Sequence, residues 1–259
     1  MSEAERKHPY ALLRIPGRPA SIRYLTGNFA PISIRLTSKP CSFEGTIPEE
    51  FLGGQYVRNG TNPIQRDNPR GFHWFDGDGM LTGVYFKRIS GPAHVQPVFT
   101  NEYVLTDIHC ATMRDRRLYP IMPSVKALTN PVSSSLRLMY EILRSMALIF
   151  ASICGLIARP IKRVSSANTS IFHHDGRVMA TNEVGPPMRV FLPLLKTVGW
   201  FTGNMAEGEP VGTDACKEGF GSPGMEGAMK EMTTAHNHRD TGVSSQSARA
   251  WACLREDDA

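Results

Sequence analysis

Short runs in which apolar and polar residues alternate fill the stretch from residue 41 to residue 105. The runs are GTIPEEFLGGQYVRNG, FHWFDGDGMLTGVYFK and VQPVFTNEYVL, and turn residues separate them. Strands that recur about every 8 to 12 residues are typical of sandwiches, barrels and propellers. Before about Lys39, prolines recur too often for a long helix, so this part predicts an irregular arm that wraps around the strands.

Asp-Gly pairs mark two predicted hairpins, because Asp-Gly supplies the positive φ angles that a tight turn needs. The pairs Asp76-Gly77 and Asp78-Gly79 lie between the apolar run 73–75 and the alternating run 80–86, which predicts that these two runs pair with each other. In the same way, Asp175-Gly176 turns the predicted strand 169–172 back into a second strand.

The segment from residue 131 to residue 163 has a helical pattern. Arg137, Glu141 and Arg144 recur on one stripe of the predicted helix, and residues 145–158 carry no charge. This uncharged stretch is too short to span a bilayer, which needs about 20 helical residues. Two interpretations stay open: a helix in the protein core, and a helix that lies in the membrane interface with basic residues at the headgroups.

The interfacial interpretation assigns the membrane contact to the apolar residues Leu148, Ile149 and Phe150, which a basic flank follows. The whole chain has 29 Lys and Arg against 24 Asp and Glu, a formal net charge of +5 over 259 residues. An excess this small agrees with an anionic membrane surface as a partner. It does not predict a nucleic acid partner.

Five widely spaced cysteines without a CxxC pair predict neither a zinc ribbon nor a disulfide framework. The N-terminal residues MSEAERKHPY lack the apolar core of a secretory signal. We therefore expect a cytoplasmic protein, or one that is peripherally associated with a membrane on its cytosolic side.

Two motifs concern ligands. Gly219, Gly221 and Gly224 match the GxGxxG pattern, but no apolar strand precedes them, so no nucleotide is predicted. His236 and His238 are two residues apart, and in an extended chain this spacing points both imidazoles to the same side, which suits a metal. A pair of exposed surface histidines is the alternative interpretation.

Several of these stretches together resemble the carotenoid cleavage oxygenases, a family of iron enzymes with carotenoid, apocarotenoid, stilbene and retinoid members. The resemblance lies in GTIPEEFLGGQYVRNGTNP, HWFDGDGMLTGVYFK, ANTSIFHHDGRVMATNEVGPPMRVFLPLLKTVGW and EMTTAHNHRDTG. It extends from about Tyr24 to Gly242 with one gap at the helical stretch. There the family commonly places apolar helices that dip into a membrane, which favours the interfacial interpretation.

The resemblance implies an all-β fold, a seven-bladed β-propeller with an apolar helical insertion, and Fe(II) held on its axis by four histidines. His236 matches the first of these ligands. Glu183 matches a glutamate that accepts a hydrogen bond from an iron-bound imidazole and so fixes its tautomer. The implied reaction adds O2 across one conjugated C=C bond of a carotenoid, apocarotenoid or stilbene and gives two carbonyl products.

The resemblance stops after Gly242, and the residues that follow contain no histidine. Residues 1–242 are thus predicted to be the N-terminal part of an incomplete propeller, with the insertion at about 131–163, and residues 243–259 an unrelated, disordered tail. Seven blades of about 40 to 45 residues need roughly 300 residues, which agrees with an incomplete propeller. We expect such a chain to be inactive alone. The alternative is a non-catalytic fragment that docks on a membrane or binds an apolar ligand.

Overall fold

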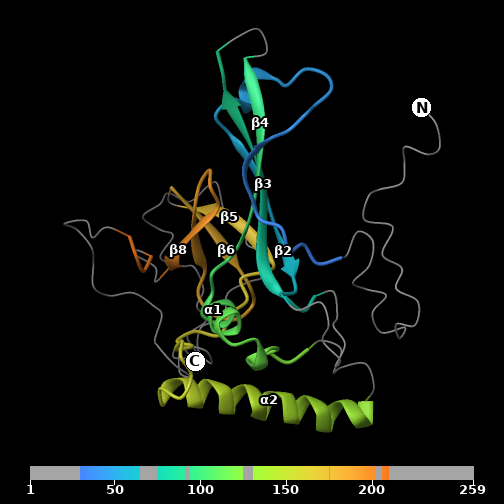
Figure 1. Ribbon diagram of the computed structural model, residues 1–259, viewed down its shortest axis with the longest axis vertical. Coiled ribbons are helices and arrows are strands. Elements are labelled where there is room, and N and C mark those ends of the chain that lie inside the picture. Colours follow the sequence, from blue (N-terminus) through green and yellow to red (C-terminus); the bar gives the residue numbers. More distant parts are fainter. Residues whose placement is uncertain are drawn as a thin grey trace, which may run out of the picture.

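The computed structural model describes residues 30–64, 75–90, 94–124, 131–174, 176–201 and 206–209 (Figure 1). These residues form two four-stranded antiparallel sheets and two α-helices. The sheets carry the alternating apolar pattern seen in the sequence. The helices connect the two sheets along the chain, because both lie between the last strand of the first sheet and the first strand of the second.

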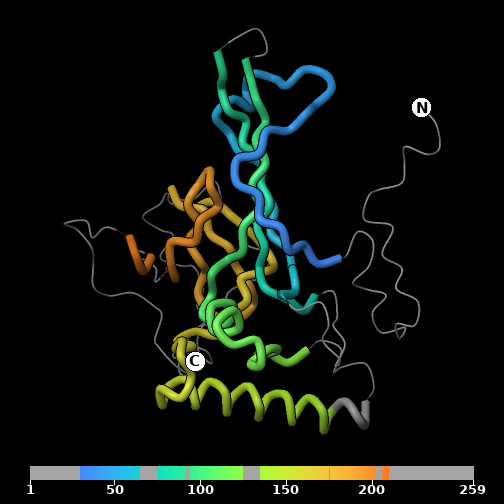
Figure 2. Tube along the Cα trace, viewed as in Figure 1, coloured from blue at the N-terminus to red at the C-terminus, as the bar shows by residue number. Residues whose placement is uncertain are grey.

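The first sheet has the strand order β1-β4-β3-β2. Its strands are β1 (Leu36–Pro40), β2 (Gln55–Asn62), β3 (Asp78–Arg88) and β4 (Val95–Tyr103). The predicted irregular arm therefore ends in a strand, which pairs with β4 from Leu36↔Asn101 to Pro40↔Val98 across a bulge. Figure 2 shows this segment running alongside the β3–β4 hairpin.

The prediction that the run 73–75 pairs with the run 80–86, which lies in β3, is wrong. This strand begins at Asp78 and pairs with β2, in a register that runs from Gln55↔Tyr85 to Asn62↔Asp78. Pairing with β2 gives β3 a partner along eight residues, many more than the run 73–75 could offer. The Asp76-Gly77 pair lies just before the strand and leads the chain into it.

The second sheet is a simple meander of β5 (Ser170–His174), β6 (Arg177–Thr181), β7 (Met188–Phe191) and β8 (Lys196–Trp200). It confirms the second predicted hairpin, since β5 pairs with β6 from Ser170↔Thr181 to His174↔Arg177. Gly176 takes the positive φ of 68° that this tight turn requires.

The two sheets pack against each other around one apolar core. Leu81 of β3 and Ala180, Met188, Val190 and Trp200 of the second sheet lie in this core, and each is buried. The backbones come close at Gly79 of β3, whose N–H donates to the carbonyl oxygen of Ser166, shortly before the second sheet, at 3.0 Å. A Cβ at Gly79 would lie under 3.0 Å from three backbone atoms of Ser166 and Ala167, so only glycine fits there.

The first helix, α1 (Asp107–Arg114), starts at Thr106, whose side chain accepts a hydrogen bond from the N–H of His109 at 3.1 Å. The second, α2 (Pro131–Ile153), makes the first part of the predicted segment 131–163 helical, whereas residues 154–163 are turns and irregular chain. That this segment is an insertion in a propeller stays a prediction. Figure 1 shows α2 lying across one end of the molecule, on the far side of α1 from the sheets. Short 3-10 helices occur at Glu49–Phe51 and Arg116–Leu118.

Two packed, four-stranded antiparallel sheets agree with the predicted β-sheet architecture, because a propeller blade is a sheet of this kind. The number of seven blades stays a prediction. Residues 210–259, which include His236 and the predicted tail, lie outside the described residues.

Candidate functional site

Glu183 lies two residues after the end of β6, at a corner that buried amide side chains hold in place. Asn182 donates through Nδ2 to Oδ1 of Asn168 at 2.9 Å and to the hydroxyl of Ser166. Asn168 donates in turn to the carbonyl oxygen of Gly77 at 2.8 Å, which ties the corner to the first sheet. Glu183 itself is exposed, and its carboxylate makes no ion pair or hydrogen bond with the described residues.

A carboxylate without a partner is available as an acceptor for an imidazole N–H, as the outer shell of a metal site requires. The described residues do not form a metal cage of their own: among them no group of three or more His, Cys, Asp or Glu side chains gathers closely enough. His236, the predicted ligand, and His238 both lie outside that part of the chain. Whether His236 approaches Glu183 is therefore still a prediction.

A second polar group, which the sequence did not suggest, is buried where α1 meets β3. Nδ1 of His109 lies 3.4 Å from Oδ1 of Asp78, and both side chains are about 95% buried. Neither Nδ1 of His109 nor Oδ2 of Asp78 has a hydrogen-bond partner among the described residues. The contact is thus electrostatic and not a well-directed hydrogen bond. No sequence pattern joins two residues this far apart in the chain.

Two neighbours of this pair have perturbed pKa values. Burial raises the pKa of the Tyr119 phenol far above its usual range, and the negative charges of Asp78 and Asp76 act in the same direction. Burial also raises the pKa of the Cys110 thiol, which disfavours a reactive thiolate at this position. The ring of Tyr103 covers His109 at a centroid distance of 4.7 Å.

The charged stripe of α2 faces the protein. Glu141 accepts from Nε of Arg137 and from the backbone N–H of Ser124, both at 2.9 Å. Arg144 donates to the carbonyl oxygens of Leu118 and Pro120. The stripe predicted from the sequence is confirmed, but its charges bind the chain that follows α1 and do not face a membrane surface.

Since the charged stripe is turned inward, the opposite face of α2 presents large apolar side chains to the outside. Their exposed fractions run from 42% at Ile142 and Met146 to 67% at Leu136. We call this set the apolar face of α2: Leu136, Met139, Tyr140, Ile142, Leu143, Met146, Phe150 and Ile153. It continues beyond the helix to Leu156, which is 79% exposed.

Of the three residues predicted to contact a membrane, Leu148, Ile149 and Phe150, only Phe150 lies on this face. Phe150 is 64% exposed and belongs to it. Ile149 is 7% exposed and packs in a cluster with Ile108, Ile121 and Ile161, and Leu148 is half-buried against the same cluster. The helical period of 3.6 residues explains this, because three consecutive residues cannot all point to one side. No helix of the described part is long and apolar enough to cross a membrane.

The paired antiparallel sheets define an all-β protein, and sequence comparison gives its family. Residues 29–245 match the family described as "RPE65: Retinal pigment epithelial membrane protein". The chain therefore belongs to the RPE65 and carotenoid cleavage oxygenase family, which confirms the resemblance seen in its motifs.

Among the relatives of this chain is the "Carotenoid dioxygenase carX" of Gibberella fujikuroi, which is 47% identical over 216 residues. The match covers 82% of this chain and 31% of that protein. The "Carotenoid cleavage oxygenase" of Mycobacterium tuberculosis is 31% identical over 180 residues, which cover 68% of this chain and 27% of that one. The chain thus spans about a third of the length of these relatives.

Solved structures similar to this one include the lignostilbene dioxygenase of Pseudomonas brassicacearum. It has a TM-score of 0.44 and 20% identity over 67% of this chain and 29% of that one. The cobalt-substituted apocarotenoid oxygenase of Synechocystis has a TM-score of 0.43 and 25% identity, over 70% of this chain and 32% of its own.

Proposed function

We propose that the chain is part of an Fe(II)-dependent dioxygenase that cleaves one conjugated C=C bond of a carotenoid, apocarotenoid or stilbene. One O2 molecule adds across the double bond, and both the σ and the π bond between the two carbons break. Each of these carbons receives one oxygen atom and becomes the carbonyl carbon of one product. Membership of the family over residues 29–245 carries this proposal. The name of the Gibberella relative, a carotenoid dioxygenase, supports the substrate class.

In this proposal His236 is one ligand of the iron, and Glu183 accepts a hydrogen bond from an iron-bound imidazole. Bound iron would supply the activation of O2. Glu183 suits its role because its carboxylate has no partner among the described residues, while Asn182 fixes the backbone next to it. A carboxylate held in this way orients the imidazole and compensates part of the metal charge.

The test is a chimera in which residues 29–242 replace the matching segment of the Gibberella relative. We expect the chimera to bind iron and to convert a carotenoid into two carbonyl products that contain 18O when 18O2 is supplied. His236→Ala should abolish both iron binding and cleavage, whereas His238→Ala, a matched change two residues away, should leave both within about twofold. Full iron content and activity in His236→Ala would contradict the proposal.

The 259-residue chain by itself should retain far less than one iron per chain after purification. A single matched imidazole binds Fe(II) weakly, since stable sites for such metals use several protein ligands. Metal analysis of the purified chain measures this directly. One tightly held iron per chain would contradict the assignment of His236 as one ligand among several that belong to other segments.

A second candidate function is docking on an anionic lipid surface through the apolar face of α2. Two observations favour it: the charged stripe of this helix is used inside the protein, and the outer face carries exposed apolar side chains from Leu136 to Ile153. Arg159 and Lys162, which follow the helix, are exposed and can meet lipid phosphates. Partition of the chain into vesicles, described in the Discussion, tests this function.

A further inference from the structure

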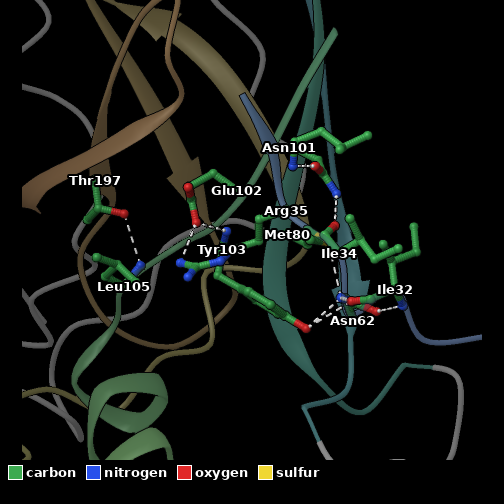
Figure 3. A network of polar contacts seen from close by, with 11 residues as sticks. Ile32, Ile34, Arg35, Asn62, Met80, Asn101, Glu102, Tyr103, Leu105 and Thr197 are labelled. Carbon is green, nitrogen blue, oxygen red and sulfur yellow. Dashed lines mark hydrogen bonds and ion pairs between the residues drawn. The ribbon is translucent and has the colours of Figure 1, made fainter. Parts of the chain in front are cut away.

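The segment from residue 30 to residue 40, which we call the arm, ends in β1, which pairs with β4, and side-chain amides of the first sheet bind the part from Ile32 to Leu36 (Figure 3). Asn62 accepts from the N–H of Ile32 at 2.8 Å and donates to its carbonyl oxygen at 2.7 Å. Asn101 accepts from the N–H of Leu36 at 2.6 Å and donates to the carbonyl oxygen of Ile34 at 2.9 Å. Each amide therefore takes the place of a neighbouring peptide group.

The contacts follow the period of an extended chain. Ser38 adds a third, because its N–H donates to Oγ1 of Thr100 at 3.1 Å. The backbone groups of residues 32, 34 and 36 are thus used on one edge of the arm, as expected for a strand, in which every second residue presents its N–H and C=O to the same side. Ser38 has a positive φ of 52° and lies at the bulge between Leu36 and Lys39, so its contact follows the extended part. Asn62, Thr100 and Asn101 are 5%, 3% and 2% exposed, so we call these three buried residues the backbone clamp.

The clamp binds backbone groups of the arm and not its side chains. Ile32 and Ile34 are 48% and 58% exposed although their backbone groups are bound. The ion pair between Arg35 and Glu102, at 3.1 Å, involves an arginine that is 60% exposed, and such surface pairs contribute little. Recognition therefore rests on an extended backbone with an N–H at residues 32 and 36.

Asn62 also connects the clamp to the inside of the sheet. Its Nδ2 also lies 2.6 Å from the hydroxyl oxygen of Tyr103 and 3.0 Å from the sulfur of Met80. Since one of the two Nδ2 hydrogens is donated to Ile32, the other is shared between these two acceptors, and both contacts restrict the orientation of the amide. A preorganised polar group of this kind binds a ligand with a smaller loss of conformational entropy.

From this arrangement we propose that Asn62, Thr100 and Asn101 form a binding site for an extended peptide backbone, occupied here by the chain's own arm. The site is a form of strand addition in which side-chain amides read the peptide. The proposal is independent of the oxygenase function, because it uses no residue of the Glu183 corner. It implies that a separate peptide with the sequence of the arm binds when the tethered arm is disabled.

The experiment uses the full chain with Ile32→Pro and Leu36→Pro, which remove the two N–H donors and leave the clamp intact. A fluorescent peptide, APISIRLTSKP, has the sequence of residues 30–40 and is titrated by anisotropy. We expect it to bind this variant at least about tenfold more tightly than the wild-type chain, where the tethered arm competes at high effective concentration. Adding Asn101→Ala to the variant should lower its affinity for the peptide by about tenfold.

Two control peptides separate backbone from side-chain recognition. The peptide N-methylated at the positions of Ile32 and Leu36 should not bind, and the peptide with Ile34→Thr should bind within about twofold of the parent. The proposal is overturned if the methylated peptide binds as well as the parent. It is also overturned if the folded proline variant binds no peptide.

If the proline variant does not fold, hydrogen exchange of the other full-chain variants decides the question. In Asn101→Ala the amide of Leu36 should exchange about tenfold faster than in the wild type, and in Ile34→Thr it should be unchanged. Equal protection of Leu36 in the wild type and Asn101→Ala would refute the clamp.

Discussion

Replacing exposed residues on the apolar face of α2 tests docking most sharply. Leu143, Met146 and Phe150 lie on one stripe, at spacings of three and four residues, and are 58%, 42% and 64% exposed. Full burial of one such side chain contributes about 1.5 to 3 kcal/mol. With about half of each side chain left to bury, the three together contribute roughly 2 to 4.5 kcal/mol to insertion in a lipid interface.

The triple variant Leu143→Ser, Met146→Ser and Phe150→Ser should therefore lose about 10² to 10³-fold in its partition coefficient. The assay is flotation of the full chain with vesicles that contain phosphatidylserine and phosphatidylcholine. The fold should persist, since these side chains point away from the contacts of Glu141 and Arg144. Circular dichroism checks this before flotation.

A matched control carries Leu105→Ser and Phe191→Ser, which are 45% and 53% exposed and lie outside α2. It should float like the wild type. In a separate variant, Arg159→Gln with Lys162→Gln should weaken binding to anionic vesicles by about tenfold and leave binding to neutral vesicles unchanged. The reasoning is refuted if the triple variant floats like the wild type, or if the control loses as much as the triple variant.

Three further predictions concern stability. Ile149→Ala should lower the free energy of unfolding by about 2 to 4 kcal/mol, because it leaves a cavity in the cluster with Ile108 and Ile161. Phe150→Ala, which truncates an exposed side chain, should change it by under about 1 kcal/mol. Urea denaturation measures both, and equal losses would contradict the inward placement of Ile149. Gly79→Ala should destabilise the contact between the sheets by more than about 2 kcal/mol, while Gly60→Ala, which meets nothing within 4 Å, should be close to neutral; a stable Gly79→Ala chain would refute the close approach. Burial raises the pKa of Tyr119 above its usual 10.0, so below pH 10 the phenol is protonated in both the folded and the unfolded chain, and above pH 10 it ionises only in the unfolded chain. The free energy of unfolding should therefore fall with rising pH by up to about 1.4 kcal/mol per pH unit from this group. Tyr119→Phe should remove that part of the slope in denaturation curves taken between pH 9 and 11, and an unchanged slope would contradict the prediction.

Local sequence patterns predicted the elements whose partners are close in the chain. The hairpin around Gly176 followed from turn chemistry, because both strands adjoin the turn. The partner of β3 did not, since turn chemistry cannot weigh a short adjacent run against a longer strand that ends at Asn62, sixteen residues before Asp78, and pairs over its whole length.

The orientation of α2 was also beyond local prediction. A stripe of Arg137, Glu141 and Arg144 normally faces water, and here it faces inward because backbone groups of residues 118–124 supply its partners. The buried contact between Asp78 and His109 joins β3 to α1 without any motif. The clamp on the arm is similar, because Asn62 and Asn101 show no pattern until the sheet brings them to the arm.

The central claim is that His236 and Glu183 belong to one metal site. Titration of the full chain with Co2+, a paramagnetic stand-in for Fe(II), tests it by NMR, because even partial occupancy broadens the resonances of nearby nuclei. The account predicts that the imidazole of His236 and the backbone amide of Val184, next to Glu183, broaden together, and that His236→Ala removes both effects. Broadening of His236 without Val184, or of the exposed His173 before either, would contradict it.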